Sequence, residues 1–387
     1  MGRVACILTF SLAGTGAPLA EEPGNLENAL AAVRAVGPNG AGSPEAARSW
    51  HILAKADLQQ LPDLLAGMDG ANPLACNWIR SAVDEVIERA KRDRQPLPRA
   101  GLETLVRDAK HHPKARRLAY ELIVGEDATA KDRFLPDMMD DPSDELRRDA
   151  VARVIEQAEK IIGTDKKSDA LPLFQKSLAG AREKDQIDKI VKRLRELGQT
   201  VDLPTHLGFI QDWRVIGPFP NEKDEGVNTA YPPEKGIDFN AEYDGKGAKV
   251  KWQPYTSRQE YGMVDLNTGV GKHTNAVAYA FAEFTSPNGQ TVEIRIGCYT
   301  VFKLWVNGEL VLERGDAYTG MSFDNYIAQA KLKPGKNTIL MKVCNAEPPA
   351  QLPKLWQFQL RVCDPTGKAI LSSTRPAIAP VEKPKSS

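Results

Sequence analysis

Five acidic residues in the C-terminal half of this 387-residue chain have side chains suited to general acid–base catalysis. Glycoside hydrolysis uses two carboxyl groups that flank the scissile bond, and the distance between them decides how the reaction proceeds. The sequence supplies the carboxyl groups without giving their separation. A glycoside hydrolase that uses a carboxylate pair, in an accessory or cryptic form, therefore stays open as an alternative function. The five candidates are Asp265, Glu283, Glu293, Asp316 and Asp324.

Other catalytic signals do not occur in the sequence. It contains no G-x-S-x-G nucleophile motif, no H-E-x-x-H motif and no complete G-x-x-x-x-G-K-[ST] phosphate loop. The stretch GVGKHT from Gly269 lacks the first glycine of that loop, and His273 follows its lysine. We therefore assign no catalytic residue, expect no cofactor and do not expect an enzyme.

Metal-binding residue types are too scattered along the chain to indicate a metal site. The cysteines include no C-x-x-C pair, and the adjacent His111 and His112 would point to different sides of a helix end. Three cysteines lie near the ends of strand-like runs, where one disulfide or buried free thiols both fit, and thiols are the simpler interpretation. These three are Cys298, Cys344 and Cys363.

The loops of the C-terminal half are rich in tyrosine, aspartate and asparagine, above all in GDAYTGMSFDNY from Gly315 to Tyr326. Aromatic faces stack on sugar rings, while carboxylate and amide groups bind the neighbouring hydroxyls. The same residues could instead close the edge of a sheet by bonding to their own backbone. A role in ligand binding and a role in the fold therefore both stay open.

The elements that position these residues follow from composition and periodicity. A chain of this length exceeds what one core usually organises, so two or three domains are expected. Charged residues make up 26% of the sequence and the formal net charge is +0. Because phosphate backbones attract strongly basic surfaces, nucleic acid is not an expected partner.

The first 20 residues have the layout of a secretory signal peptide. Arg3 precedes an apolar run from Val4 to about Gly14, and small residues follow up to Ala20. We expect an exported protein, whether periplasmic, secreted or attached to the cell surface. No later run is apolar for long enough to span a membrane.

Residues from Leu74 to about Gly198 have helical periodicity. In LACNWIRSAVDEVIERA, apolar residues recur three and four apart, and Asn72 with Pro73 forms a plausible cap and first turn. Ser143 with Asp144 should begin another helix. The preceding residues 21–49 are rich in Ala, Gly and Pro and are expected to form a loosely structured segment with one short helix.

Two helical stretches repeat the same pattern of arginines. Arg116 and Arg117 in PKARRLAYELI correspond to Arg147 and Arg148 in DELRRDAVARVI. In these stretches the chain resembles the HEAT-like helical repeat families, whose hairpins stack around a shared core. A plain irregular bundle is the alternative. The arginines are expected to be solvated and paired with acids such as Asp144 and Asp149, with a binding face as the alternative.

From Phe209 onward the periodicity changes to two, and turn residues separate many short strand-like runs. The pattern predicts an antiparallel β-sandwich or jelly roll. In VFKLWVNGELVLE, Asn307 and Gly308 suit a type I′ turn. That turn would pair Val306 with Glu309, Trp305 with Leu310 and Leu304 with Val311. Both faces of this hairpin are apolar, so each must be covered, and Trp305 is expected to contact a loop, the helical domain or a ligand.

At these residues the chain resembles the galactose-binding-like jelly-roll modules that accompany catalytic domains in many secreted glycosidases. The W-V-N-G turn at Trp305–Gly308 and the L-x-P-G-x-N-T turn at Leu332–Thr338 carry the resemblance. It implies a module without catalytic activity that binds sugar, where it does so, through loops at one end or an edge. The candidate ligand-binding residues are then Trp252, Tyr299, Asp316, Tyr318, Asp324, Asn325 and Tyr326, with Tyr255 and Tyr261 as further loop aromatics.

The sequence thus predicts an α+β multidomain protein in which an all-α domain precedes an antiparallel sandwich. The expected segments are a signal peptide (1–20), a loosely structured segment (21–49), a helical domain (50–204), a sandwich (205–366) and a disordered tail (367–387). The expected function is non-catalytic binding or scaffolding outside the cytoplasm, with carbohydrate or another protein as the ligand.

Overall fold

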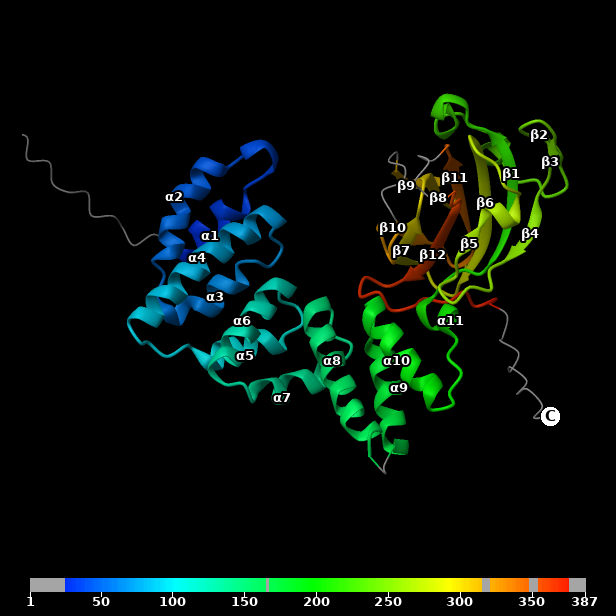
Figure 1. Ribbon diagram of the computed structural model, residues 1–387. Coiled ribbons are helices and arrows are strands. Elements are labelled where there is room, and N and C mark those ends of the chain that lie inside the picture. Colours follow the sequence, from blue (N-terminus) through cyan, green and yellow to red (C-terminus); the bar gives the residue numbers. More distant parts are fainter. Residues whose placement is uncertain (1–24, 165–166, 315–320, 348–353, 376–387) are drawn as a thin grey trace, which may run out of the picture. The chain divides into compact units, whose positions relative to one another are not determined.

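The computed structural model describes residues 25–164, 167–314, 321–347 and 354–375. Its contacts divide the chain into two compact units, Met1–Phe134 and Leu135–Ser387. Helices fill the first unit and the start of the second, and antiparallel strands dominate the remainder (Figure 1). The predicted α+β class is confirmed. None of the described helices is both long and apolar enough to cross a membrane.

The first unit is made of helices of 5 to 20 residues that bury apolar side chains. In α4, the Asn72 side chain accepts a hydrogen bond from the Ala75 backbone N–H (3.0 Å) and Pro73 occupies the first turn, as predicted. The helices are α1 (Leu26–Arg34), α2 (Ser43–Ala54), α3 (Leu61–Ala66), α4 (Pro73–Arg92), α5 (Arg99–Arg107), α6 (Pro113–Glu126) and α7 (Ala130–Phe134).

The segment expected to be loosely structured, residues 21–49, instead contains α1 and most of α2 where it is described. The Asn25 side chain caps α1 by accepting from the Glu27 backbone N–H (2.9 Å), and Leu30 and Val33 are buried. Its alanines are the strongest helix formers. The prediction gave too much weight to glycine and proline: Gly37, Pro38, Gly40 and Gly42 lie in the connection between the two helices, and Pro44 lies in the first turn of α2.

Arg116 and Arg147 are buried, which corrects the prediction that the paired arginines are solvated, whereas the predicted pairing of an arginine with Asp144 is confirmed at Arg147. Arg116 is 1% exposed and donates through Nε and Nη2 to the Val106 carbonyl (3.0 and 2.8 Å). Arg147 is 2% exposed and donates to the Asp141 carbonyl (2.6 Å). A guanidinium has several N–H donors, so it can satisfy a carbonyl in an apolar interior. In each stretch the first arginine thus ties its helix to the segment before it.

The second arginine of each pair is less buried than the first: the side chain of Arg117 is 23% exposed and that of Arg148 is 44% exposed. Arg117 pairs with Glu121 one turn along α6 (2.8 Å), and Arg148 pairs with Asp185. Adjacent residues on a helix point about 100° apart, so the first arginine of each pair is buried while the second reaches the surface.

The second unit begins with helices and continues as strands. Ser143 caps α8, as predicted, by accepting from the Leu146 backbone N–H (3.5 Å). The longer helices are α8 (Asp144–Ile162), α9 (Ala170–Gly180) and α10 (Lys184–Glu196), and the short ones are α11 (Leu203–Leu207), α12 (Pro232–Lys235) and α13 (Leu266–Gly269).

The strands of the second unit pair in antiparallel fashion. Within the described residues they form a six-stranded sheet in the order β4-β1-β6-β11-β8-β9, a four-stranded sheet in the order β10-β7-β12-β5, and the small pair β2-β3. The strands are β1 (Asp212–Pro220), β2 (Tyr243–Asp244), β3 (Lys249–Val250), β4 (Gln253–Thr256), β5 (Val264–Asp265), β6 (Ala276–Ser286), β7 (Gln290–Cys298), β8 (Val301–Val306), β9 (Glu309–Arg314), β10 (Tyr326–Leu332), β11 (Gly335–Asn345) and β12 (Gln357–Cys363).

One face of each larger sheet contributes to a single buried cluster. Ala280 and Met341 enter it from the six-stranded sheet, and Ile294 and Leu360 enter it from the four-stranded sheet. The opposite face of the six-stranded sheet carries a second cluster, which residues 227–252 cover in part. We call this opposite face the outer face.

The β8–β9 hairpin confirms the predicted turn and corrects part of the predicted register. Asn307 and Gly308 both have positive φ (54° and 83°), and Trp305 pairs with Leu310. Leu304 pairs with Leu312 rather than with Val311, because a bulge leaves Val311 without a direct partner on β8. A bulge adds one residue to a strand, so alternation counted from the turn fails beyond it.

The two turns that carry the family resemblance are hydrogen bonded to each other. Asn307 Oδ1 accepts from the Thr338 backbone N–H (3.1 Å), and its Nδ2 donates to Asn337 Oδ1 (2.8 Å). Asn337 is fully buried and also bonds to the backbone of Lys333 and Gly335. The two motifs therefore form one structural element.

The helices of the second unit are joined to its strands through loop side chains. Phe209, Tyr261 and Phe323 pack edge to face against one another and join the cluster formed by α8, α9 and α10. Arg195 pairs with Glu260. Of the predicted disordered tail, residues 367–375 are described and are held in place: Arg375 donates to the Phe209 carbonyl (2.8 Å). Residues 376–387 lie outside the described part.

Candidate functional site

A row of apolar side chains crosses the outer face of the six-stranded sheet. Phe281 on β6 pairs with Leu340 on β11, which pairs with Trp305 on β8. Directly paired residues on neighbouring strands lie side by side on the same face. These three side chains line a hollow of about 330 Å³, which we call the Trp305 hollow. Trp305 is only partly buried, so its ring is accessible there.

Residues Pro233–Ile237 form the wall of the Trp305 hollow, and a buried lysine holds them in place. Lys342 is 0% exposed, and its ammonium donates to the Val227 and Thr229 carbonyls (3.0 and 2.8 Å) and to Glu234 Oε1 (2.8 Å). A buried charge needs this complete set of partners. The ammonium therefore fixes the segment that leads into the wall.

Glu234 has a second partner in the Tyr279 hydroxyl, which donates to the same carboxylate oxygen. Burial and this hydrogen bond raise the pKa of Tyr279 above its ordinary value, so the phenol stays protonated and continues to donate. Because Lys342 and Tyr279 are both on strands and both hold Glu234, the hollow is formed before any ligand arrives.

The composition of the Trp305 hollow suits a ring with one apolar face and polar edges. Its floor is aromatic and aliphatic, while Thr338 at the rim offers a hydroxyl and the exposed Lys235 offers an ammonium. Pockets of a few hundred Å³ with an apolar floor and a few fixed polar groups are typical of small-ligand sites. The carboxylate of Glu234 in this wall accepts from both Lys342 and Tyr279 through Oε1.

A second hollow of about 400 Å³ lies on the same face, beyond a ridge formed by Ile237 and Phe239. Phe239 packs edge to face on Phe281 (5.4 Å between ring centres), and the Arg214 guanidinium lies 4.5 Å above the Phe239 ring. We call it the Arg214 hollow. Asp212, Glu283 and Tyr255 also line it.

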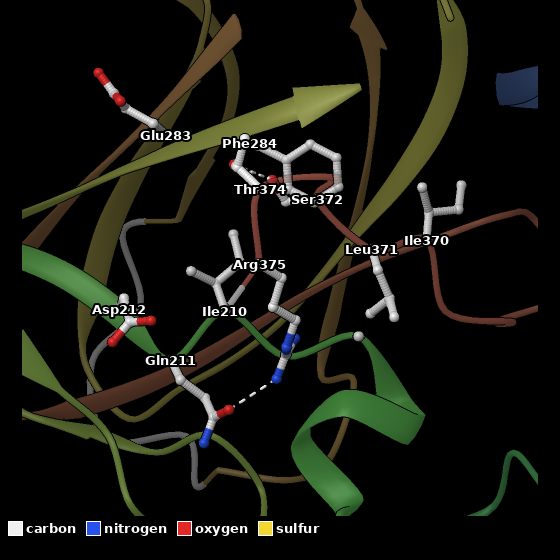
Figure 2. Close-up of a pocket in the computed structure, with 11 residues that line it drawn as sticks. Ile210, Gln211, Asp212, Glu283, Phe284, Ile370, Leu371, Ser372, Thr374 and Arg375 are labelled. Atoms are coloured by element: carbon white, nitrogen blue, oxygen red, sulfur yellow. Dashed lines mark hydrogen bonds between the residues drawn. The ribbon is translucent and has the colours of Figure 1, made fainter. Parts of the chain in front are cut away.

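A third hollow, of about 410 Å³, lies where the C-terminal segment crosses β1 and β6 (Figure 2). The Arg375 guanidinium donates to Gln211 Oε1 (2.7 Å) and spans its floor. Asp212 and Glu283 both line it, but Figure 2 shows their carboxylates turned in different directions. Asp212 accepts from the Thr256 hydroxyl (2.7 Å) and Glu283 from the Lys336 ammonium (2.9 Å). The two acids do not act on one point.

The predicted ligand-binding residues are not gathered in one place. Trp252 is 5% exposed and packs against Phe239 and Phe281 below the ridge (5.8 and 6.3 Å between ring centres). Tyr299 is buried at the turn between β7 and β8. The remaining described ones, Asp324, Asn325 and Tyr326, follow one another at the start of β10. Asp316 and Tyr318 lie outside the described residues.

Asp324 takes part in a buried ion network. It pairs with Arg361, which is 0% exposed, and with Arg295 (3.2 Å), and Arg295 also pairs with Glu293 (2.8 Å). Arg361 donates onward to the Leu207 carbonyl (3.2 Å) at the end of α11. Asp324 thus joins helix to sheet. Of its neighbours, Asn325 is exposed, and Tyr326 packs its ring on Phe302.

The other predicted acids have structural partners as well. Asp265 caps α13 by accepting from the Asn267 backbone N–H (2.9 Å). Glu293 and Asp324 lie on either side of the Arg295 guanidinium, which occupies the space that a substrate would need between them. The four predicted acids that the structure describes, Asp265, Glu283, Glu293 and Asp324, are therefore each engaged by a partner of their own.

Residue types that could bind a metal are not clustered within the described part of the chain. Cys298, Cys344 and Cys363 are buried free thiols there, as the simpler interpretation predicted. Burial raises the pKa of Cys298 to about 12 and that of Cys363 to about 11, so these thiols are neutral.

Cys76 and His112 in the first unit approach each other without forming a nucleophile and base. His112 Nε2 lies 3.8 Å from Cys76 Sγ, while His112 Nδ1 accepts from the Lys114 backbone N–H (3.1 Å). The ring proton must then be on Nε2, which points it at the sulfur. Burial also raises the pKa of Cys76 above its ordinary value, so the thiol keeps its proton.

The residues of the Trp305 hollow other than Trp305 itself were missed at the sequence level. One signal was present: in AVAYAFAEF, alanines alternate with Val277, Tyr279 and Phe281. The alanines face the core between the sheets, so the large residues must face the other side and need a cover there. Which segment supplies the cover depends on contacts distant in sequence.

No family model matches the sequence, and no curated protein matches it. Among solved structures, a family 35 carbohydrate-binding module from Clostridium thermocellum aligns with 22% of this chain and 69% of its own, at 18% identity and a TM-score of 0.15. A β-glucosidase from Kluyveromyces marxianus aligns with 72% of this chain and 35% of its own, at 10% identity and a TM-score of 0.25. A Pseudomonas fluorescens alkylpurine DNA glycosylase aligns with 90% and 95%, at 12% identity and a TM-score of 0.20. Scores this low do not establish a shared fold, so these similarities carry no argument.

Proposed function

We propose that this protein is an exported, non-catalytic binding protein that takes carbohydrate in the Trp305 hollow. The observation that carries the proposal is the row of Phe281, Leu340 and Trp305, which presents an accessible aromatic ring on an apolar floor with a hydroxyl and an ammonium at the rim. Sugars have apolar ring faces and hydroxyl edges, and this lining complements both. The proposed site lies on a sheet face rather than in the loops that the family resemblance implies.

We also propose a specific fold for the β region and for the helices. The β region is proposed to be a galactose-binding-like sandwich, supported by the shared core of its two sheets and by the interlocked turns at Asn307 and Asn337. The helices are proposed to be HEAT-like, supported by the matched burial of Arg116 and Arg147. Export is supported by the apolar run from Val4 to Gly14. A nucleic-acid partner is not proposed, since the formal net charge is +0.

A glycan array probed with the full chain tests the proposed function. The wild-type protein and Trp305→Phe should bind the same glycans, because an aromatic face is kept, whereas Trp305→Ala should lose binding. Tyr326→Ala serves as the matched aromatic control from the start of β10 and should bind like the wild type. Loss of binding in Tyr326→Ala but not in Trp305→Ala would move the site to the start of β10, and an array with no bound glycan would refute the proposal.

A further inference from the structure

The Trp305 hollow and the Arg214 hollow are linked by polar side chains on the outer face. Thr338, at the rim of the Trp305 hollow, is directly paired with Glu283 across β11 and β6, and Glu283 lines the Arg214 hollow. Phe281 contributes to the floor of both hollows. Phe281, Thr338 and Glu283 therefore connect the two hollows beside the ridge of Ile237 and Phe239, and we call this row of side chains the path between them.

The separation of the hollows sets the size of the ligand. Trp305 is on β8 and Arg214 is on β1, and β11 and β6 lie between them. Three strand spacings amount to about 14 Å. This span exceeds one sugar ring and matches a short chain of linked rings. Each hollow, at about 330 and 400 Å³, has the size of a small-ligand pocket.

The shape of the face favours a thin flexible chain over a protein surface. A stable protein interface covers about 800 Å² on each partner with close-fitting contact. The ridge that carries Phe239 stands between the hollows and interrupts any flat contact of that size. A chain of sugar rings can bend around such a ridge because each glycosidic link rotates.

The polar groups along the path suit hydroxyls. Glu283 accepts from the Lys336 ammonium (2.9 Å) and Asp212 accepts from the Thr256 hydroxyl (2.7 Å), so both side chains carry oxygens that accept hydrogen bonds. The Arg214 guanidinium is stacked on Phe239 and keeps its N–H donors at the surface. The path thus offers acidic acceptors and basic donors in similar number. This mixture complements neutral sugars better than anionic ones.

We infer that the two hollows are subsites of one site for a neutral oligosaccharide, which runs from Trp305 past Thr338 and Glu283 to Arg214. This inference rests on the proposed function and adds the class of ligand. Trp305 supplies the stacking platform of the first subsite. Arg214 and Asp212 supply the second subsite, which only a chain of several units reaches.

Isothermal titration of the full chain with cello-, xylo- and β-1,4-galacto-oligosaccharides, from the disaccharide to the hexasaccharide, tests the inference. In at least one series, affinity should rise by about tenfold or more with length. Arg214→Ser and Asp212→Ala should reduce hexasaccharide affinity to near that of the disaccharide and leave disaccharide affinity unchanged. Lys249→Ala, which removes another exposed cation of the β region, is the matched control and should bind every length like the wild type.

The outcomes separate the inference from the proposed function. If affinity is the same for all lengths, or if Arg214→Ser and Asp212→Ala bind the hexasaccharide like the wild type while Trp305→Ala does not bind, the extended site is refuted and the proposed function stands. If none of the three series binds while the glycan array shows a bound glycan, the inference fails and the proposed function stands; if the array shows none either, both fail. A circular dichroism spectrum of each variant verifies that it is folded.

Discussion

Arg116 and Arg117 are adjacent on α6 and have opposite surroundings. The Arg116 guanidinium is buried and satisfies the Val106 carbonyl, whereas Arg117 pairs with Glu121 near the surface. Buried and exposed charges differ greatly in their effect on stability, because a buried group left without its partner cannot turn to water instead. This pair allows the difference to be measured within one helix.

We expect Arg116→Met to lower the free energy of unfolding by about 2 kcal/mol, because the Val106 carbonyl would stay buried without its donor. Arg117→Met should change it by less than about 1 kcal/mol, the usual size for a surface ion pair. Urea denaturation followed by circular dichroism measures both. Equal effects of the two substitutions would show that Arg116 is not the tie between α6 and the segment before it.

His206 on α11 should make the second unit less stable in acid. Burial lowers the pKa of its imidazole, and the ring donates through Nε2 to the Leu178 carbonyl (3.0 Å). Since its folded pKa lies below its unfolded pKa of about 6.5, the unfolded chain takes up this proton first as the pH falls. The free energy of unfolding is therefore not reduced by His206 above a pH of about 6.5, and it decreases as the pH drops below that value.

His206→Gln isolates this contribution, because glutamine can still donate to the Leu178 carbonyl but does not titrate. The free energy of unfolding of the variant should fall less steeply between pH 7 and pH 5 than that of the wild type. Denaturation midpoints measured at several pH values provide the comparison. Parallel curves for the two proteins would mean that His206 can be protonated in the folded state.

At the level of elements, the interlocked turns make the β8–β9 hairpin depend on the turn before β11. Asn307 and Asn337 share a hydrogen bond (2.8 Å). Asn307 also accepts from the Thr338 backbone in the other turn, and Asn337 donates to the Lys333 carbonyl in its own turn. A double-mutant cycle of Asn307→Ala and Asn337→Ala should give a coupling energy of about 1 kcal/mol or more. A control cycle that combines Asn307→Ala with Asn325→Ala, a more distant asparagine, should give a coupling energy near zero.

These two turns also show how far sequence reasoning reaches. The positive φ of Asn307 and Gly308 follows from local preference and was predicted correctly. The bulge at Val311 and the bond between Asn307 and Asn337 depend on residues that meet only after folding. The Trp305 hollow has the same origin, since its floor comes from three strands and its wall from residues 233–237. The types of these residues could be read from the sequence, but their contacts in the folded chain could not be predicted from it.

At the level of the whole molecule, the helices α8–α11 belong to the same compact unit as the sheets. Arg361 bonds to the Leu207 carbonyl, and Tyr261 donates to Asp188 on α10. The sequence placed a boundary near residue 204, where the periodicity changes, but a change of secondary structure does not by itself separate two cores. The cluster that contains Phe209 includes residues from α8 through α11.

Hydrogen exchange in low denaturant should therefore show α10 and β12 losing amide protection together. Asp324→Ala should accelerate exchange in both, because it leaves the buried Arg361 without its carboxylate, at a cost of about 3 kcal/mol. Amides of α4, in the other compact unit, serve as the internal control and should exchange as in the wild type. Protection of β12 lost without that of α10 would separate the helices from the sheets.

The chain enters and leaves the β region side by side. The Ile210 backbone N–H donates to the Leu360 carbonyl (3.0 Å), and Val362 donates to Gly208 (3.1 Å). Residues 364–375 follow β12, and at their end Arg375 donates to the Phe209 carbonyl. The two ends of the β region are therefore neighbours. The region could be circularly permuted by joining Arg375 to Phe209 through a short linker and opening the chain at another loop. The strand order in space would be unchanged, although the order of synthesis would be new.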